Sequence, residues 1–277
     1  MKRIVTIQDI SCLGKCSLTV ALPIISAMGV ECSIIPTAVL STHTQFSGFT
    51  FCDLTKEIEP IGNHWKKENF KFDSIYTGYL GSFEQLKLVS DFFDDFKTEK
   101  NNIVIDPVMA DNGVLYKGFT VEFAKSMAKL CGKADYIMPN LTEASFMLDF
   151  PYEEGKHDRK YYENIIDKLL ELGTKTAILT GVSLNDGKLG VMSRSKNDKE
   201  YFYYEREHLP VSFHGTGDIF ASAFTGGVTL GYTAEKSLEI AVNYTVETIK
   251  KTLSDPEANS YGTNFELAIP YLLSQLK

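Results

Sequence analysis

Long apolar runs, cysteine and positive charge are all scarce in this sequence of 277 residues. No stretch approaches the roughly 18 consecutive apolar residues of a membrane helix, and the N-terminus lacks the apolar region of a signal peptide. The 28 Lys and Arg residues are outnumbered by 36 Asp and Glu residues, which gives a net charge of −8, and no basic run is suited to a phosphate backbone. We therefore expect a cytoplasmic protein that binds neither membranes nor nucleic acids.

Several common site signatures are also missing. The five cysteines are odd in number and form no CxxC pair, which argues against zinc ribbons and thioredoxin-like redox sites and favours packed thiols in a reducing compartment. Gly14-Lys15 lacks a glycine at the spacing of a P-loop, and no GxGxxG, HExxH or GxSxG motif occurs. These absences disfavour dinucleotide-dependent dehydrogenases, zinc proteases and α/β-hydrolases.

Short runs rich in β-branched residues alternate with longer amphipathic stretches. This alternation predicts crossover βαβ units, and hence an α/β fold with a mostly parallel central sheet and helices on both faces. No linker or internal repeat divides the chain, so we expect a single domain over residues 1–277. Strands are predicted at Arg3–Ile7, Glu31–Pro36, Ser74–Thr77, Asn102–Ile105, Tyr136–Met138 and Thr176–Leu179, with an antiparallel hairpin at Leu189–Ser193 and Glu200–Tyr204. Helices are predicted at Ser17–Met28, Phe83–Phe96, Phe119–Leu130, Thr142–Leu148, Tyr161–Leu172, Asp218–Leu230, Ala234–Leu253 and Asn264–Leu276.

The segment Thr37–Asp53 breaks this alternation. It is polar and aromatic, contains Gly48, and has the period of neither a helix nor a core strand. Two interpretations fit, and they are compatible: a flap that covers a site, or an irregular hairpin at the edge of the sheet.

Polar or glycine residues follow several of the predicted parallel strands. Ligands of open α/β sheets bind beyond the carboxyl ends of the strands, so this series marks the expected site. It comprises Gln8-Asp9, Thr77-Gly78-Tyr79, Asp106-Pro107, Pro139-Asn140 and Thr180-Gly181.

The sharpest motif is Gly215-Thr216-Gly217-Asp218, at the start of a helix rich in small residues. Its glycines allow a tight turn that exposes backbone N–H groups, and the positive end of the helix points to the same place. These features predict a nest for a phosphoryl group, with Asp218 placed to accept a proton from an attacking hydroxyl. A simple helix cap uses the same residue types, but the position of the motif late in an α/β chain favours the functional interpretation.

Two further stretches carry polar groups beyond strand ends. The acidic loop Asp106–Gly113 has the composition of a segment that folds over a ligand, although an ordinary polar turn has it too. Asn140 and Glu143 have the spacing of a capping box. Alternatively, their amide and carboxylate hold Mg²⁺ through water, since magnesium keeps several waters when few protein groups bind it.

With these motifs the chain resembles the ribokinase superfamily and, within it, the pyridoxal (vitamin B6) kinases. The resemblance covers essentially the whole length, and it implies a ribokinase-like three-layer α/β/α sandwich with a small flap at about residues 37–53. It also implies ATP-dependent phosphorylation of the 5′-hydroxymethyl group of pyridoxal, pyridoxine or pyridoxamine. The residues that carry it are Gly215–Asp218, Asp106-Pro107-Val108-Met109 with Gly113 and Tyr116, Pro139-Asn140 with Glu143, Thr77-Gly78-Tyr79-Leu80-Gly81, and His43-Thr44-Gln45-Phe46.

The resemblance further implies roles for individual residues. Asp218 is the expected catalytic base, and Gly215, Thr216 and Gly217 are the expected anion hole for the γ-phosphoryl group. Mg²⁺ is expected near Asp106 and Glu143, through water, while a role for K⁺ is left open and a homodimer is the implied assembly. Substrate contacts are expected from Asp9, Thr44, Gln45, Tyr79 and Asp218. ATP contacts are expected from Asp106, Asn140, Glu143, Thr180, His208 and Phe213.

Two departures from the family pattern bear on substrate and loop closure. Ala110-Asp111 stands where many members have Gly-Asp, which predicts a less flexible loop. Asp9 stands where bacterial pyridoxal kinases often carry Ser, and an Asp there is similar to the hydroxymethylpyrimidine kinases of thiamine synthesis. Their glycine-rich motif after this Asp is missing, however, and GTGD replaces their GTGC. The alternatives are therefore a hydroxymethylpyrimidine kinase and a non-catalytic protein that binds a vitamer or nucleotide.

Overall fold

A computed structural model describes residues 1–276 as two compact units. Unit 1 comprises Met1–Gly78 together with the chain from Leu209 onward, and unit 2 comprises Tyr79–His208. Among the described residues, every helix is too short or too polar to cross a membrane. The single domain over residues 1–277 stays a prediction.

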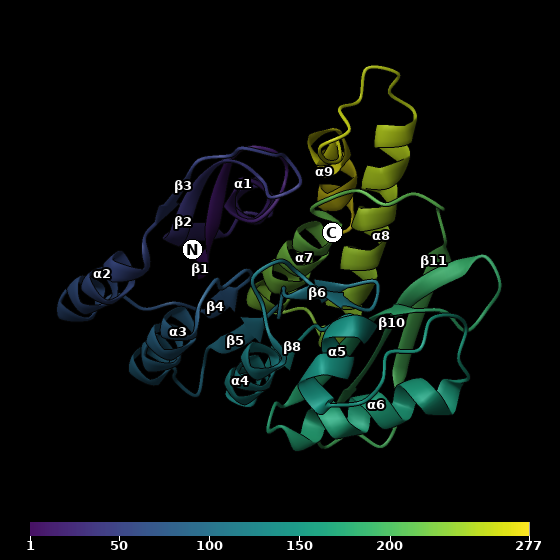
Figure 1. Cartoon of the computed structure of the whole chain (residues 1–277), viewed down its shortest axis with the longest axis horizontal. Helices are drawn as coiled ribbons and strands as arrows, with labels where there is room; N and C mark the ends of the chain where they lie inside the picture. Colours follow the sequence, from purple (N-terminus) through teal and green to yellow (C-terminus); the bar gives the residue numbers. More distant parts are fainter. Residues whose placement is uncertain (277) are drawn as a thin grey trace. The chain divides into compact units, whose positions relative to one another are not determined.

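Unit 1 is built around strand β1, which pairs in parallel with β2 and with β4, while β3 pairs antiparallel with β2. Helix α1 packs on β1 and β2 and also contacts α7, which in turn packs beside α8 (Figure 1). The first residues of α7 therefore lie on an element that is fixed against β1 and α1. The elements are β1 (Arg3–Leu13), α1 (Leu18–Ala27), β2 (Glu31–Thr42), β3 (Phe51–Asp53), α2 (Thr55–Lys67), β4 (Ser74–Thr77), α7 (Thr216–Leu230), α8 (Ala234–Leu253) and α9 (Phe265–Ser274).

Unit 2 has strand β8 between β5 and β9, all parallel, and then β10 and β11, each antiparallel to its neighbour. Helix α5 packs on β9 and on the small hairpin β6–β7, and α4 packs between α3 and α5. The elements are α3 (Phe83–Phe96), β5 (Asn102–Ile105), β6 (Ala110–Asp111), β7 (Val114–Leu115), α4 (Val121–Cys131), β8 (Tyr136–Ile137), α5 (Leu141–Leu148), α6 (Arg159–Glu171), β9 (Thr176–Val182), β10 (Lys188–Ser195) and β11 (Phe202–Glu207). The predicted α/β fold with a mostly parallel sheet is confirmed.

The strands of both units carry apolar side chains that are completely buried. On β1, Ile4, Val5 and Ile7 are completely buried, and on β5 the same is true of Val104 and Ile105. Burial on both faces is typical of parallel strands covered by helices. Such strands are rigid supports for Asp106, directly after β5, and for Asp9, which lies within β1 rather than after it as predicted.

Three local structures differ from the sequence prediction. Strands β1 and β2 run on into the segments predicted to be loops, and β2 with β3 forms the irregular edge hairpin that was one interpretation of Thr37–Asp53. Helix α2 was not predicted, because Pro60 and Gly62 lie inside it and weaken its helical pattern. Hairpin β6–β7 turns at Asn112 and Gly113, whose φ values are 50° and 77°, as expected for an Asn-Gly turn.

Candidate functional site

The first group of site residues lies in unit 1 and centres on two carboxyl groups. Asp9, near the middle of the long strand β1, is buried, and Asp218 lies in the first turn of α7. Ser17 lies beside both: its hydroxyl donates to Asp9 Oδ1 at 2.7 Å, and its backbone N–H lowers the pKa of the Asp218 carboxyl. The structure therefore brings together two residues that the sequence predicted and one that it did not.

Burial and mutual repulsion set the protonation of this pair. Burial raises the pKa of Asp218 to about 7, and the negative charge of Asp9 adds to the rise. Burial also raises the pKa of Asp9, while hydrogen bonds from Ser17 and Ser11 lower it. A carboxyl group with a pKa near neutral pH is suited to accept a proton as a general base.

The glycine turn before Asp218 is fixed by its surroundings. Gly215 is the N-cap of α7 with φ 82°, a value that favours glycine, and a Cβ there would collide with the backbone carbonyl of Lys15. No side chain caps this helix end, so its first N–H groups stay available to an anion. Gly217 is exposed and Thr216 is partly exposed. This geometry fits the predicted anion hole.

His43 links the β2–β3 segment to two loops, the one before α7 and the one before α9. Its ring lies 4.3 Å from the ring of His214 and its Nε2 atom is 2.9 Å from the carbonyl of Tyr261. Burial and His43 together lower the pKa of His214 to about 4, so this ring is neutral at neutral pH. The predicted substrate residues Thr44 and Gln45 follow His43 directly, and both are exposed.

The second group of site residues lies in unit 2, at the start of α5. Asn140 and Glu143 form a capping box: Asn140 Oδ1 accepts from the Glu143 N–H at 2.9 Å, and Glu143 Oε2 accepts from the Asn140 N–H at 2.9 Å. Glu143 Oε1 also accepts from the N–H of Met109 at 3.1 Å, and the Asn140 amide donates to the carbonyl of Ala110 at 2.9 Å. The capping interpretation is therefore correct, and the same two side chains also hold the loop after β5.

Asp106 and Glu143 are two carboxyl groups buried in the same part of unit 2. Burial raises the pKa of Glu143 well above its usual range, and the charge of Asp106 raises it further. Two neighbouring buried carboxylates suit a divalent cation, which relieves their repulsion, and Mg²⁺ needs only one or two of them when phosphates and water complete its shell. The described residues contain no cluster of three or more ligands that could hold a metal without such help.

The remaining predicted residues are placed as follows. Thr180, on β9, bridges to Asn140, and its N–H donates to the carbonyl of Pro139 at 3.0 Å. Tyr79 is partly buried, with its ring 5.5 Å from that of Phe119, and His208 is exposed. Phe213 lies in the loop before α7 and accepts the Thr216 hydroxyl through its carbonyl. Ala110 has no positive φ, so its backbone conformation does not require the glycine that many family members have.

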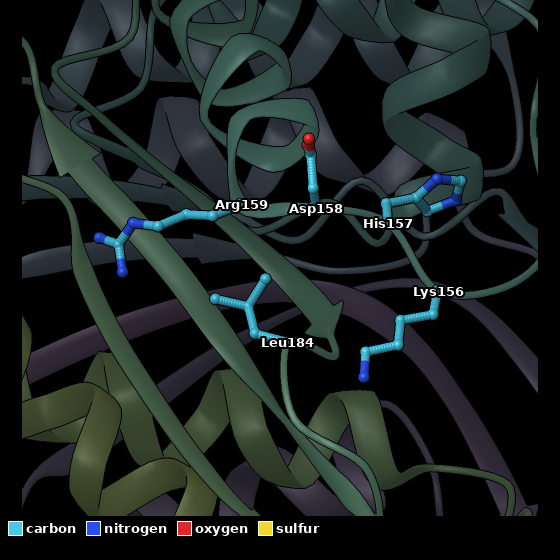
Figure 2. A pocket seen from close by; sticks show the side chains of 5 residues that line it. All are labelled: Lys156, His157, Asp158, Arg159 and Leu184. Atoms are coloured by element: carbon cyan, nitrogen blue, oxygen red, sulfur yellow. The ribbon is translucent and has the colours of Figure 1, made fainter.

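A hollow of about 450 Å³ in unit 2 contains none of these residues. It is lined by Lys156, His157, Asp158, Arg159 and Leu184, and the cationic ends of Lys156 and Arg159 extend to different sides of it (Figure 2). Both cations already have partners, Asp186 at 2.6 Å and Glu163 at 2.7 Å. The hollow therefore lacks the convergent free charge of a phosphate site.

The fold places the chain in the ribokinase-like class of α/β proteins. More particularly, the chain belongs to the phosphomethylpyrimidine kinase family, whose model matches residues 24–261.

Relatives of known name agree with the resemblance to pyridoxal kinases. The pyridoxal kinase of Dictyostelium discoideum is 26% identical over 96% of this chain and 93% of its own length. A Bacteroides thetaiotaomicron protein, provisionally described as a phosphomethylpyrimidine kinase and solved with pyridoxal, is 39% identical with a TM-score of 0.92 over 98% of this chain and 95% of its own. The pyridoxal kinase of Lactobacillus plantarum is 27% identical with a TM-score of 0.90 over 99% and 97%.

Proposed function

We propose that the protein is a pyridoxal kinase, which transfers the γ-phosphoryl group of ATP to the 5′-hydroxymethyl group of a B6 vitamer. The observation that carries this proposal is Asp218, a carboxyl group with a pKa near 7 in the first turn of a helix whose N-terminus has no side-chain cap. Full-length similarity to curated pyridoxal kinases and to a structure solved with pyridoxal supports the choice of substrate.

In the proposed reaction Asp218 takes the proton of the vitamer hydroxyl as its oxygen attacks the γ-phosphorus. The bond from that oxygen to phosphorus forms, the bond to the bridging oxygen of ATP breaks, and ADP leaves. The N–H groups of Thr216 and Gly217, with the turn at Gly215, stabilise the charge on the transferring group. Asp9 and the exposed flap residues Thr44 and Gln45 contact the substituents of the pyridine ring.

Most of the residues assigned to the nucleotide lie in unit 2. Asp106 and Glu143 would hold Mg²⁺ through water, and the cation would neutralise phosphate charge when bound. Asn140 and Thr180 are assigned to the ATP phosphates, and Tyr79 to the vitamer. His208 and Phe213 are assigned to the adenine and ribose of ATP.

A hydroxymethylpyrimidine kinase is the second candidate, favoured by Asp9 and by the name of the family model. An ATP-consumption assay with pyridoxal, pyridoxine, pyridoxamine and hydroxymethylpyrimidine separates the candidates, and repeating it in K⁺ or Na⁺ tests for a monovalent cation. We expect turnover to be fastest with a B6 vitamer. Faster turnover of hydroxymethylpyrimidine would reassign the substrate, and binding without ATP consumption would identify a non-catalytic binding protein.

The assembly and location belong to the same proposal. Leu13, Phe46 and Phe51 are exposed large apolar residues near the β2–β3 hairpin, and their burial between two copies would support a homodimer. All five cysteines are free, which fits a reducing cytoplasm. Sedimentation of the purified protein distinguishes a dimer from a monomer.

A further inference from the structure

Ser17 has a backbone conformation that serine rarely adopts. Its φ is 49° and its ψ is −130°, close to the first central position of a type II′ turn, where glycine dominates. A non-glycine residue held in such a conformation is strained, and such strain gathers at functional sites. The chain nevertheless has serine at this position.

The strained backbone and the hydroxyl of Ser17 each make a separate contact. The Ser17 carbonyl begins α1 by accepting from the N–H groups of Val20 at 3.0 Å and Ala21 at 2.9 Å. Its hydroxyl donates to Asp9 Oδ1 at 2.7 Å, and its N–H lowers the pKa of the Asp218 carboxyl on α7. One residue therefore influences both Asp9 and Asp218.

Glycine would relieve the strain at this position and keep the N–H, but it would lose the hydroxyl. Ser17 is buried, and Asp9 has a second but longer donor in Ser11, whose hydroxyl is 3.3 Å away. The side chain of Ser17 is thus the shortest donor to the Asp9 carboxylate. The presence of serine rather than glycine favours a role of its hydroxyl beyond the start of α1.

We infer that Ser17 is a positioning residue of the kinase: its hydroxyl holds Asp9 in its charged form beside the base Asp218. The inference rests on the proposed role of Asp218 as the base. It adds a coupling between two residues: the charge of Asp9, the carboxylate assigned to the pyridine ring, sets the proton affinity of the base Asp218.

The direction of this coupling follows from the charges around Asp218. Asp9 on β1 is the anionic neighbour that raises the Asp218 pKa. Of the other titratable groups nearby, the Cys16 thiol has its pKa raised by burial, His214 has its pKa lowered to about 4, and Lys15 is bound to Glu266 at 2.9 Å. His43 packs against His214, with 4.3 Å between the rings. Loss of the Ser17 hydroxyl raises the pKa of Asp9, and a neutral Asp9 no longer raises that of Asp218.

The test compares Ser17→Ala and Ser17→Gly with the wild type. The readout is the acidic limb of the pH profile of kcat for pyridoxal, which reports the base in the substrate complex. We expect both variants to move this limb to lower pH, by on the order of half a unit, and Asp9→Asn to move it in the same direction. Ser17→Gly, which lacks the strained Cβ, keeps the test usable if the alanine variant does not fold.

Ser74→Ala is the matched control, because it removes another buried hydroxyl of unit 1, which pairs with Thr229 at 2.7 Å. It should leave the limb in place. If the limb of Ser17→Ala and Ser17→Gly also stays in place, or moves to higher pH, Ser17 is only a structural residue and the inference is wrong.

A second readout needs no turnover. Infrared titration of the carboxyl band that disappears in Asp218→Asn measures the protonation of Asp218 directly. A shift of this titration to lower pH in the Ser17 variants, in a protein that phosphorylates none of the substrates, would uphold the coupling and reject the proposed function. Turnover by the wild type with an unshifted band would reject the coupling alone.

Discussion

The Glu143 carboxylate accepts a hydrogen bond from the backbone N–H of Met109 at 3.1 Å, while its other oxygen accepts from the N–H of Asn140. One side chain therefore caps α5 and fixes the start of the loop after β5. Because both of its oxygens face N–H donors, the site specifies a carboxylate rather than an amide of the same size.

Glu143→Gln should therefore destabilise the protein. An amide NH₂ group would face one of the two backbone N–H donors and leave it without an acceptor, which costs about 1–3 kcal/mol. Urea denaturation at pH 8 measures this loss, less the gain from removing a buried charge that Asp106 repels. Glu163→Gln is the control, since it breaks only a surface pair with Arg159 on α6, which is worth about 0.3–0.5 kcal/mol. Equal losses in the two variants would contradict the double role of Glu143.

Gly215→Ala should remove most of the kinase activity. The new Cβ would collide with the Lys15 carbonyl, at a residue whose φ of 82° favours glycine. The turn would have to move, and its N–H groups would no longer point to the phosphoryl group. We expect kcat to fall by about 10²-fold, as for loss of an oxyanion donor. Gly231→Ala matches the strain without the collision, because its φ is 99° and nothing lies near its Cβ position. That control should cost stability of about 1–2 kcal/mol and keep kcat.

Asp218 should make the folded state less stable as the pH rises. Its folded pKa, about 7, lies above the usual value of 3.8, so its stabilising contribution is complete below about pH 4 and is lost as the pH rises through 7. Asp218→Asn removes this dependence. Since one pKa unit is worth about 1.4 kcal/mol and the residue is partly accessible, the variant should be more stable than the wild type by about 1–2 kcal/mol at pH 8. Denaturation at pH 5 and pH 8 checks this, and an equal difference at both values would contradict it.

The sequence predicted the elements whose signals are local. Runs such as Asn102–Ile105 are short, apolar and bounded by polar residues, and they are strands as predicted. The capping box of Asn140 and Glu143 follows from a spacing of three residues and is also confirmed. The Asn112-Gly113 turn carried a hairpin signal that the sequence interpretation left unused.

Features that depend on distant contacts were not predictable in this way. From the sequence, Ser17 is an ordinary helix start, because neither its positive φ nor its hydrogen bond to Asp9 is visible in a local pattern. His43 belonged to the flap motif, but its packing against His214 depends on the path of two loops. Helix α2 forms although Pro60 and Gly62 disfavour a helix locally, because the burial of Ile58 stabilises it.

The most direct measurement is the steady-state turnover of pyridoxal by purified Asp218→Asn protein in the presence of ATP and Mg²⁺. Loss of a positioned base predicts a fall in kcat of about 10²-fold or more, with a much smaller change in the KM for pyridoxal. Turnover close to that of the wild type would show that the proton of the hydroxymethyl group goes elsewhere, and would contradict the account.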